Sequence, residues 1–95
     1  MIAERRGLLT FETAESLAVD TFAWLADETD ALARFIAISG VDQTTLRAAA
    51  ADPGFLCGVL DFVTGDDAVL MAYADHAGVR PERLVAARRT LNGYD

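Results

Sequence analysis

The feature that most constrains the fold is an apolar stretch from Pro53 to Val63 in the middle of the chain. Asp52 stands where an N-cap would, Pro53 where a helix would begin, and Gly65 where it would end. On a helical wheel the large apolar residues cover nearly half of the circumference. They are Phe55, Leu56, Val59, Leu60, Phe62 and Val63. Because so apolar a helix must be covered by its neighbours, we expect residues 53–64 to form the central helix of a small domain.

The composition indicates an all-α fold for the rest of the chain. Hydrophobic residues make up 53% of the 95 residues and charged residues 24%, which is ordinary for a globular protein and unlike a disordered chain. Alanine and leucine favour helices, and runs of β-branched residues, which favour strands, are missing. A chain of this length forms one domain and buries about 60–65% of its unfolded surface.

Capping residues and apolar spacing predict five further helices. The first helix would run from Thr10 to Ala26 and the second from Asp27 or Thr29 to Gly40, and Asp42 would cap a short third helix. After the central helix, the fifth would run from Asp66 to Gly78 and the sixth from Pro81 to Asn92. The joints between these helices are short and leave no room for a linker. We therefore expect an all-α, compact six-helix domain over residues 10–95, preceded by a flexible lead-in over residues 1–9.

The two halves of the chain have similar patterns. A shift of 38 residues places Gly40 on Gly78 and Phe35 on Tyr73, and aligns the first three expected helices with the last three. Two interpretations stay open. The domain consists of two duplicated three-helix units around the central helix, or two glycine-ended hairpins share the same geometry by chance.

Several segments resemble a known family. They are Trp24-Leu25-Ala26, the run from Arg34 to Asp42, Leu46-Arg47, the run from Asp52 to Leu56, the run from Val59 to Phe62, and the run from Ala77 to Glu82. The chain is similar, over about residues 9–91, to a bacterial, mainly alphaproteobacterial, family of short, single-domain, all-helical proteins classed as a domain of unknown function. The resemblance implies a cytoplasmic helical domain and implies no activity.

The residue types needed for catalysis or metal binding are scarce. The chain has one histidine, His76, and one cysteine, Cys57, and most of its aspartates stand where helices begin. A zinc site needs three or four ligands, and no second histidine is present to join His76. Cys57 lies in the expected central helix, where a thiol behaves as a small apolar group. We therefore expect no enzyme, no cofactor and no metal site.

The expected compartment is the cytoplasm. One cysteine cannot form a disulfide within the chain, which fits a reducing environment. The longest apolar run, residues 68–74, is far shorter than the roughly 18 residues that a membrane span needs. Arg5 and Arg6 are flanked by acidic residues and no long apolar segment follows them, so we expect no signal peptide and no membrane anchor.

The charge distribution argues against nucleic acid but leaves one alternative open. The net charge is −7, yet residues 80–95 carry four arginines and two acids. Residues 70–91 have the spacing of a helix-turn-helix, in which the last helix would be the recognition helix. Its candidate nucleic-acid contacts are Arg80, Arg83 and Arg89. The same spacing occurs at residues 35–49, which include the acidic Asp42, and this favours a packing role for the pattern. We therefore expect no DNA binding.

The function that we predict is binding of another protein, as an adaptor or regulator. The candidate partner-docking face is the small-residue side of the central helix, formed by Gly54, Cys57, Gly58 and Asp61. Helical glycines each cost about 1 kcal/mol relative to alanine, and such a face usually lets another backbone come close. We expect the first or last helix of the same chain to cover it, and expect a monomer or weak homodimer whose protein partner is unknown.

Overall fold

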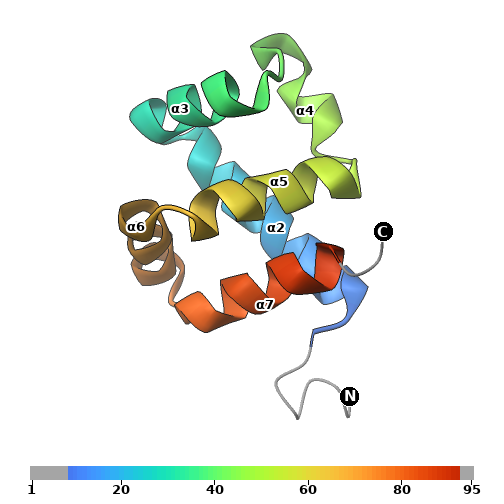
Figure 1. The fold of residues 1–95 in the computed structure, drawn as a ribbon, viewed down its shortest axis with the longest axis vertical. Coiled ribbons are helices and arrows are strands. Elements are labelled where there is room, and N and C mark those ends of the chain that lie inside the picture. Colours follow the sequence, from blue (N-terminus) through green and yellow to red (C-terminus); the bar gives the residue numbers. More distant parts are fainter. Residues whose placement is uncertain (1–8, 93–95) are drawn as a thin grey trace.

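Every regular element of the described chain is helical. The computed structural model describes residues 9–92, with the side chains of Gln43 and Arg47 excepted, and contains no strand in that range (Figure 1). The long helices are α2 (Phe11–Ala26), α3 (Thr29–Ser39), α5 (Pro53–Thr64), α6 (Asp67–Ala77) and α7 (Pro81–Asn92). Between α3 and α5, the 3-10 turn η1 (Gln43–Thr45) leads into the four-residue helix α4 (Leu46–Ala49).

Side-chain caps begin most of the long helices where the sequence predicts them. The Thr10 hydroxyl accepts from the backbone N–H of Thr13, and the Asp52 carboxylate accepts from Gly54 N–H. Asp66 accepts from the first N–H groups of α6. The start of α3 differs, because its N-cap is Glu28, which makes no side-chain capping bond, rather than Asp27 or Thr29. These bonds satisfy N–H groups that a helix leaves free at its N-terminus.

Two of the expected glycine stops have the conformation that requires glycine. Gly40 and Gly78 have φ values of 73° and 68°, and their N–H groups bond to the carbonyls of Ile36 and Ala74. This left-handed conformation ends α3 and α6 sharply. Gly65, by contrast, has φ of −84° and closes α5 in an ordinary right-handed conformation.

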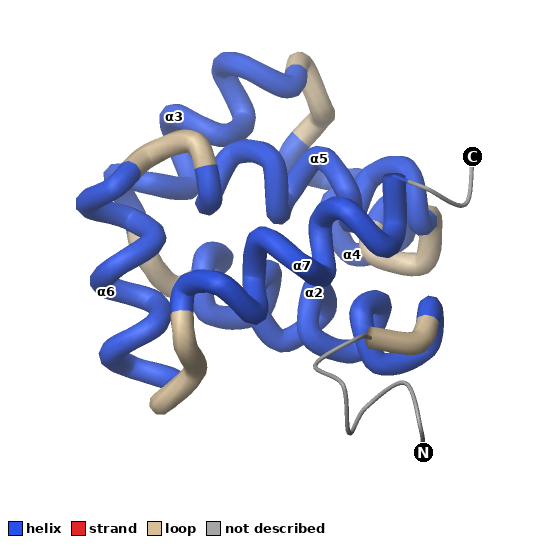
Figure 2. Tube along the Cα trace, turned by 60° about the horizontal axis from the view of Figure 1, so that its bottom comes forward, coloured by secondary structure: helices blue, strands red, loops and turns tan. Residues whose placement is uncertain are grey.

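The core lies where α2, α5 and α7 pack together. In Figure 1, α5 lies in the middle, between α3 and α7, and α2 crosses behind α5 and α7. Figure 2 shows α6 linking α5 to α7 at one end. The fully buried large side chains are Leu25, Leu56, Val59, Leu60, Val63, Leu84 and the polar Thr21. The central position expected for residues 53–64 is therefore what the structure shows.

Burial follows the apolar faces of the helices except at the end of α6. Ala77 follows Leu70 and Tyr73 at helical spacing, which predicts an inward position, but Ala77 is exposed and Ala74 is buried instead. Leu9 is buried as well, although we expected it within the flexible lead-in. The remainder of that lead-in and the last three residues lie outside the described part of the chain.

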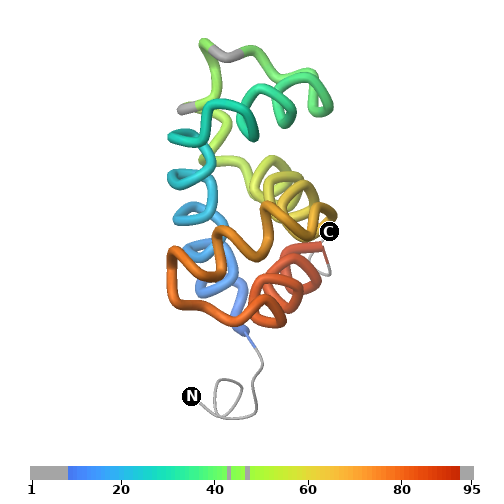
Figure 3. The backbone as a smooth tube through the Cα atoms, turned by 90° about the vertical axis from the view of Figure 1, so that its left-hand side faces the viewer, coloured from blue at the N-terminus to red at the C-terminus, as the bar shows by residue number. Residues whose placement is uncertain are grey.

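The expectation of six full helices is wrong. The segment between α3 and α5 forms only one 3-10 turn and one α-helical turn, so the described chain has five long helices. Figure 3 shows this segment at the far end of the molecule from α7. Its counterpart under the 38-residue shift, α7, packs closely on α2 and α5, whereas η1 and α4 pack closely on no long helix. The two-repeat architecture is therefore not supported.

Candidate functional site

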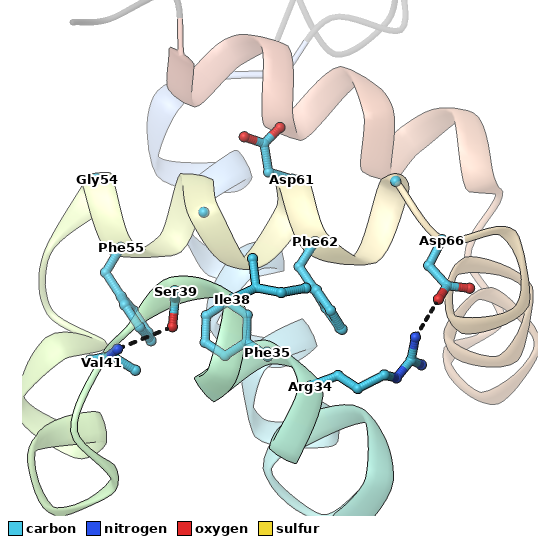
Figure 4. Close-up of a pocket in the computed structure, with 12 residues that line it drawn as sticks. Arg34, Phe35, Ile38, Ser39, Val41, Gly54, Phe55, Asp61, Phe62 and Asp66 are labelled. Atoms are coloured by element: carbon cyan, nitrogen blue, oxygen red, sulfur yellow. Dashed lines mark hydrogen bonds and ion pairs between the residues drawn. The ribbon is translucent and has the colours of Figure 1, made fainter.

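An open groove runs between α3 and α5 (Figure 4). Its volume is about 850 Å³, and apolar atoms dominate its lining. One wall comes from the C-terminal half of α3 and the turn at Val41, and the other comes from α5. At one end of the groove, Arg34 of α3 contacts Asp66 at the start of α6.

The α5 wall is low because it carries glycines. Gly54, Gly58 and Gly65 line the groove and follow one another at intervals of four and seven residues, which places them on one side of the helix. A Cβ atom added at Gly58 would meet nothing within 4 Å. The expectation that another helix of the same chain covers Gly58 is therefore wrong. The reason is geometric: α2 and α7 both pack on the opposite, apolar side of α5.

The opposite wall and the floor are aromatic and aliphatic. The Phe35 ring lies edge-on between Phe55 and Phe62, with ring centroids 5.7 and 5.5 Å apart. Edge-to-face contacts at this spacing stabilise aromatic clusters and hold the rings in place. Ile38 lies beside them and is 75% exposed, the most exposed large hydrophobic side chain in the described chain. The groove thus has a rigid floor and an uncovered apolar edge.

A polar contact closes one end of the groove. Arg34 Nη1 lies 2.8 Å from Asp66 Oδ2, and the Arg34 guanidinium lies 5.7 Å from the centre of the Phe62 ring. The hydrogen bond from Arg34 lowers the pKa of the Asp66 carboxyl below its usual value, and the bond from Val69 N–H adds to this effect. Arg34 therefore joins α3 to the start of α6 while it covers part of an aromatic face.

The predicted docking face belongs to two different surfaces. Gly54 and Gly58 border the groove, but the Asp61 carboxylate points away from α3 and accepts a hydrogen bond from Arg88 of α7 (Figure 4). This bond raises the pKa of the Arg88 guanidinium. Cys57 is half-buried on the same side, with its Sγ 4.0 Å from the Arg88 carbonyl oxygen. Cys57 and Asp61 therefore contribute to the α5–α7 contact, not to the groove as a docking surface.

The residues of α3 that form the second wall are absent from the predicted site. Phe35 belongs to the buried core as well as to the groove, and the exposed Ile38 is not part of the predicted docking face. The signal was present in the sequence, because the apolar residues 35–38 cover about 300° of a helical wheel. A helix packed on one side cannot bury all of them. This excess of apolar residues predicts an exposed apolar edge on the helix, but it does not predict which element faces that edge.

The helix-turn-helix spacing is used for packing. The Val79 N–H bonds to the Ala74 carbonyl at the turn, and Tyr73 and Ala74 are buried. The inner face of α7, formed by Leu84, Ala87 and Leu91, packs into the core. Arg80, Arg83 and Arg89 are exposed, and the structure does not bring them to the groove.

The described residues contain neither a metal-binding cluster nor a membrane-spanning helix. Between residues 9 and 92, no three side chains of His, Cys, Asp or Glu are placed to hold one metal ion. None of the helices in that range combines the length and the apolar character that a membrane crossing needs.

The comparisons with known proteins give one match. A family model described as "Protein of unknown function (DUF3572)" matches residues 11–94. Searches of the curated proteins and of the solved structures find no match to the chain.

Proposed function

The chain belongs to this family, and for this member we propose a non-catalytic role as a protein-binding adaptor or regulator that takes an amphipathic helix of another protein into the groove between α3 and α5. The observation that carries the proposal is the open space at Gly58, opposite the apolar wall of α3. We place this protein in the bacterial cytoplasm, as the family resemblance implies.

The glycines support binding of a helix. Glycine in a helix costs about 1 kcal/mol relative to alanine, and neither Gly54 nor Gly58 has the positive φ that would require it. Packing within the chain does not require Gly58 either, because nothing lies where its Cβ would be. A glycine at this position does let a foreign backbone approach α5 more closely than the usual 8–10 Å between helix axes.

The dimensions of the groove suit an incoming helix of about three turns. The 12 residues of α5 span about 18 Å at 1.5 Å per residue. Peptide helices that bind in grooves bury anchors at positions i, i+3 or i+4 and i+7, which cover two to three turns. Ile38, Phe55 and Phe62 would contact such anchors, with the buried Phe35 ring behind them.

Charge favours a basic partner over a second copy of the chain. Asp52 lies at the Gly54 end of the groove, and Arg34, the single basic residue among those described as lining it, is paired with Asp66. Two copies would also bring net charges of −7 together. We therefore expect a monomer that binds a helix with lysine or arginine residues beside its apolar face.

The test compares two leucine substitutions at helical positions, one at the half-buried Gly58 and one at the exposed Ala72. Gly58→Leu fills the groove, and the control Ala72→Leu adds the same side chain to α6 outside it. Each tagged protein is purified from its native cell at low salt, with and without nuclease, and bound proteins are identified. The apolar helix of the identified partner is then synthesised, and its Kd is measured with purified wild-type and variant proteins.

We expect a direct complex with the partner that survives nuclease treatment. The Ala72→Leu variant should keep the affinity of wild type. The Gly58→Leu variant should bind at least ten-fold more weakly, although its circular dichroism spectrum shows that it is folded. Equal peptide affinity for wild type and Gly58→Leu would overturn the proposal. Loss of all bound material after nuclease would instead support the DNA-binding alternative at α6–α7, which no feature of the described chain favours.

A further inference from the structure

A second depression lies between the C-terminal ends of α2 and α6, away from the groove. Its volume is about 480 Å³. From α2 it is lined by Asp20, Ala23, Trp24 and Asp27, from the start of α3 by Glu28, and from α6 by Tyr73, His76 and Ala77. These residues form an aromatic floor with a rim of three carboxylates, and no lysine or arginine is among those described as lining it.

Three rings form the aromatic part of this depression. The centroid of Trp24 lies 5.2 Å from that of Tyr73 and 6.3 Å from that of His76, and the Tyr73 and His76 centroids are 6.4 Å apart. The planes are tilted by 33° to 53°, so the rings do not stack flat, and the accessible ring surface comes from Trp24 and His76, which pack against the buried Tyr73. Tyr73 is only 3% exposed and is fixed by the core, while Trp24 is half-buried and His76 is exposed.

The backbone adds negative potential at the same place. Residues 23–26, followed by the C-cap Asp27, and residues 74–77 are the last turns of α2 and α6, so two helix C-termini meet the depression. Each helix C-terminus carries about half a negative charge on its free carbonyl groups. The last turn of α2 contains no basic residue to offset this potential, and that of α6 contains only His76 among the described residues. Rings, carboxylates and helix ends therefore all favour a positive charge.

We propose that this depression binds an organic ammonium ion of the size of a trimethylammonium group. Its methyl groups would contact the ring faces, where a cation is attracted to the π-electrons, and its charge would face the carboxylates. A small metal cation fits less well, because the carboxylates of the rim are not among any three side chains of the described residues that are placed to hold one metal ion. The same group occurs on free small molecules such as choline and on trimethylated lysine side chains of proteins.

The single tryptophan of the chain lies in the site, so its fluorescence reports binding directly. The full-length protein is titrated at constant ionic strength with choline chloride, with 3,3-dimethylbutan-1-ol, which has the same shape without the charge, and with sodium chloride. A short peptide containing trimethyllysine forms a fourth arm. Asp27→Asn removes one carboxylate of the rim, and Glu82→Gln, which removes an exposed carboxylate of α7 outside the depression, is its matched control.

The expected result is a saturable change in Trp24 emission with choline and none with the neutral alcohol or sodium chloride. Asp27→Asn should weaken choline binding on the order of 2- to 5-fold, in keeping with an exposed cation site, and Glu82→Gln should leave it within error. Tighter binding of the peptide than of choline would identify a protein side chain as the source, and the reverse order a free small molecule. A non-saturable response, equal binding of the neutral alcohol, or equal effects of Asp27→Asn and Glu82→Gln would overturn the proposal.

A variant of the floor tests the rings by a second measurement. Trp24→Leu keeps an apolar side chain but removes the π-system, and choline binding is then followed by NMR shifts of the Tyr73 ring protons. Wild type should show saturable shifts, and Trp24→Leu should show affinity reduced at least five-fold with an unchanged circular dichroism spectrum. Unchanged affinity in the folded variant would show that the rings do not bind the cation, which contradicts the proposal.

Discussion

Arg34 and Asp66, 32 residues apart in the chain, form an ion pair of 2.8 Å that connects α3 to the N-cap of α6. Asp66 has two functions at once, because the same carboxylate accepts from the N–H groups of Ala68 and Val69. The contact closes one end of the groove and limits how far α3 can separate from α5. It also makes the stability of the domain dependent on the protonation of one carboxyl.

The first prediction concerns this dependence on pH. The hydrogen bond from Arg34 lowers the pKa of Asp66 below its ordinary value of 3.8 in the folded state. Its contribution to stability is therefore fully present above that ordinary value and is lost as the pH falls through the lower folded value. We expect Asp66→Asn to destabilise the protein at pH 7 and to have progressively less effect below pH 3.8.

Urea unfolding of wild type and variant between pH 7 and pH 2.5 measures this difference. Asp67→Asn is the control, because Asp67 follows directly in α6 and forms no ion pair within the described chain. A destabilisation by Asp66→Asn that stays constant over the whole pH range would contradict the prediction.

The second prediction tests the central role of α5. Leu60 is fully buried in the core, and truncation of a buried leucine to alanine costs about 2–5 kcal/mol. Leu60→Ala should lower the free energy of unfolding by that amount in guanidinium titrations. Met71→Ala is the comparison, because Met71 is 57% exposed and should change the free energy by less than about 1 kcal/mol. A cost below about 1 kcal/mol for Leu60→Ala would mean that α5 is not at the centre of the core.

The third prediction separates two kinds of glycine. Gly58 has open space at its Cβ position, so Gly58→Ala should raise the free energy of unfolding by about 0.5–1 kcal/mol through helix propensity. Gly78 has φ of 68°, so Gly78→Ala should lower it by about 1–2 kcal/mol. Both are measured by guanidinium unfolding. If Gly58→Ala destabilises the protein, the space beside α5 is filled and the groove is not a docking surface.

The fourth prediction concerns nucleic acid. The net charge of −7 should prevent binding, so we expect no change in the fluorescence anisotropy of a labelled DNA duplex even at low salt. If Arg80, Arg83 and Arg89 do contact phosphates, log affinity will fall with log salt by about 0.9 per contact, and the triple alanine variant will flatten that slope. That outcome would restore the DNA-binding alternative.

Most helix boundaries and core faces could be predicted from the sequence because they depend on neighbouring residues. Asp52 and Asp66 cap helices through N–H groups two or three positions away, and Gly40 and Gly78 end helices through their own φ values. The same local logic identified α5 as the central helix. It failed for residues 42–49, where one capping aspartate and one buried leucine could not show that the helix stops after a single turn.

The two candidate sites were decided by contacts between residues far apart in the chain. The sequence alone places Gly58 on a small-residue face of α5, but whether that face is open depends on where α2, α3 and α7 pack. In the same way, Trp24 and Tyr73 appear in the sequence only as members of separate helices. The tertiary structure brings the centroids of their rings to 5.2 Å from each other. The sequence thus determines which faces are apolar, small or charged, because those are local properties of a helix. Which faces meet and which stay uncovered is a property of the whole packing arrangement, because every helix has several neighbours that compete for the same apolar surface.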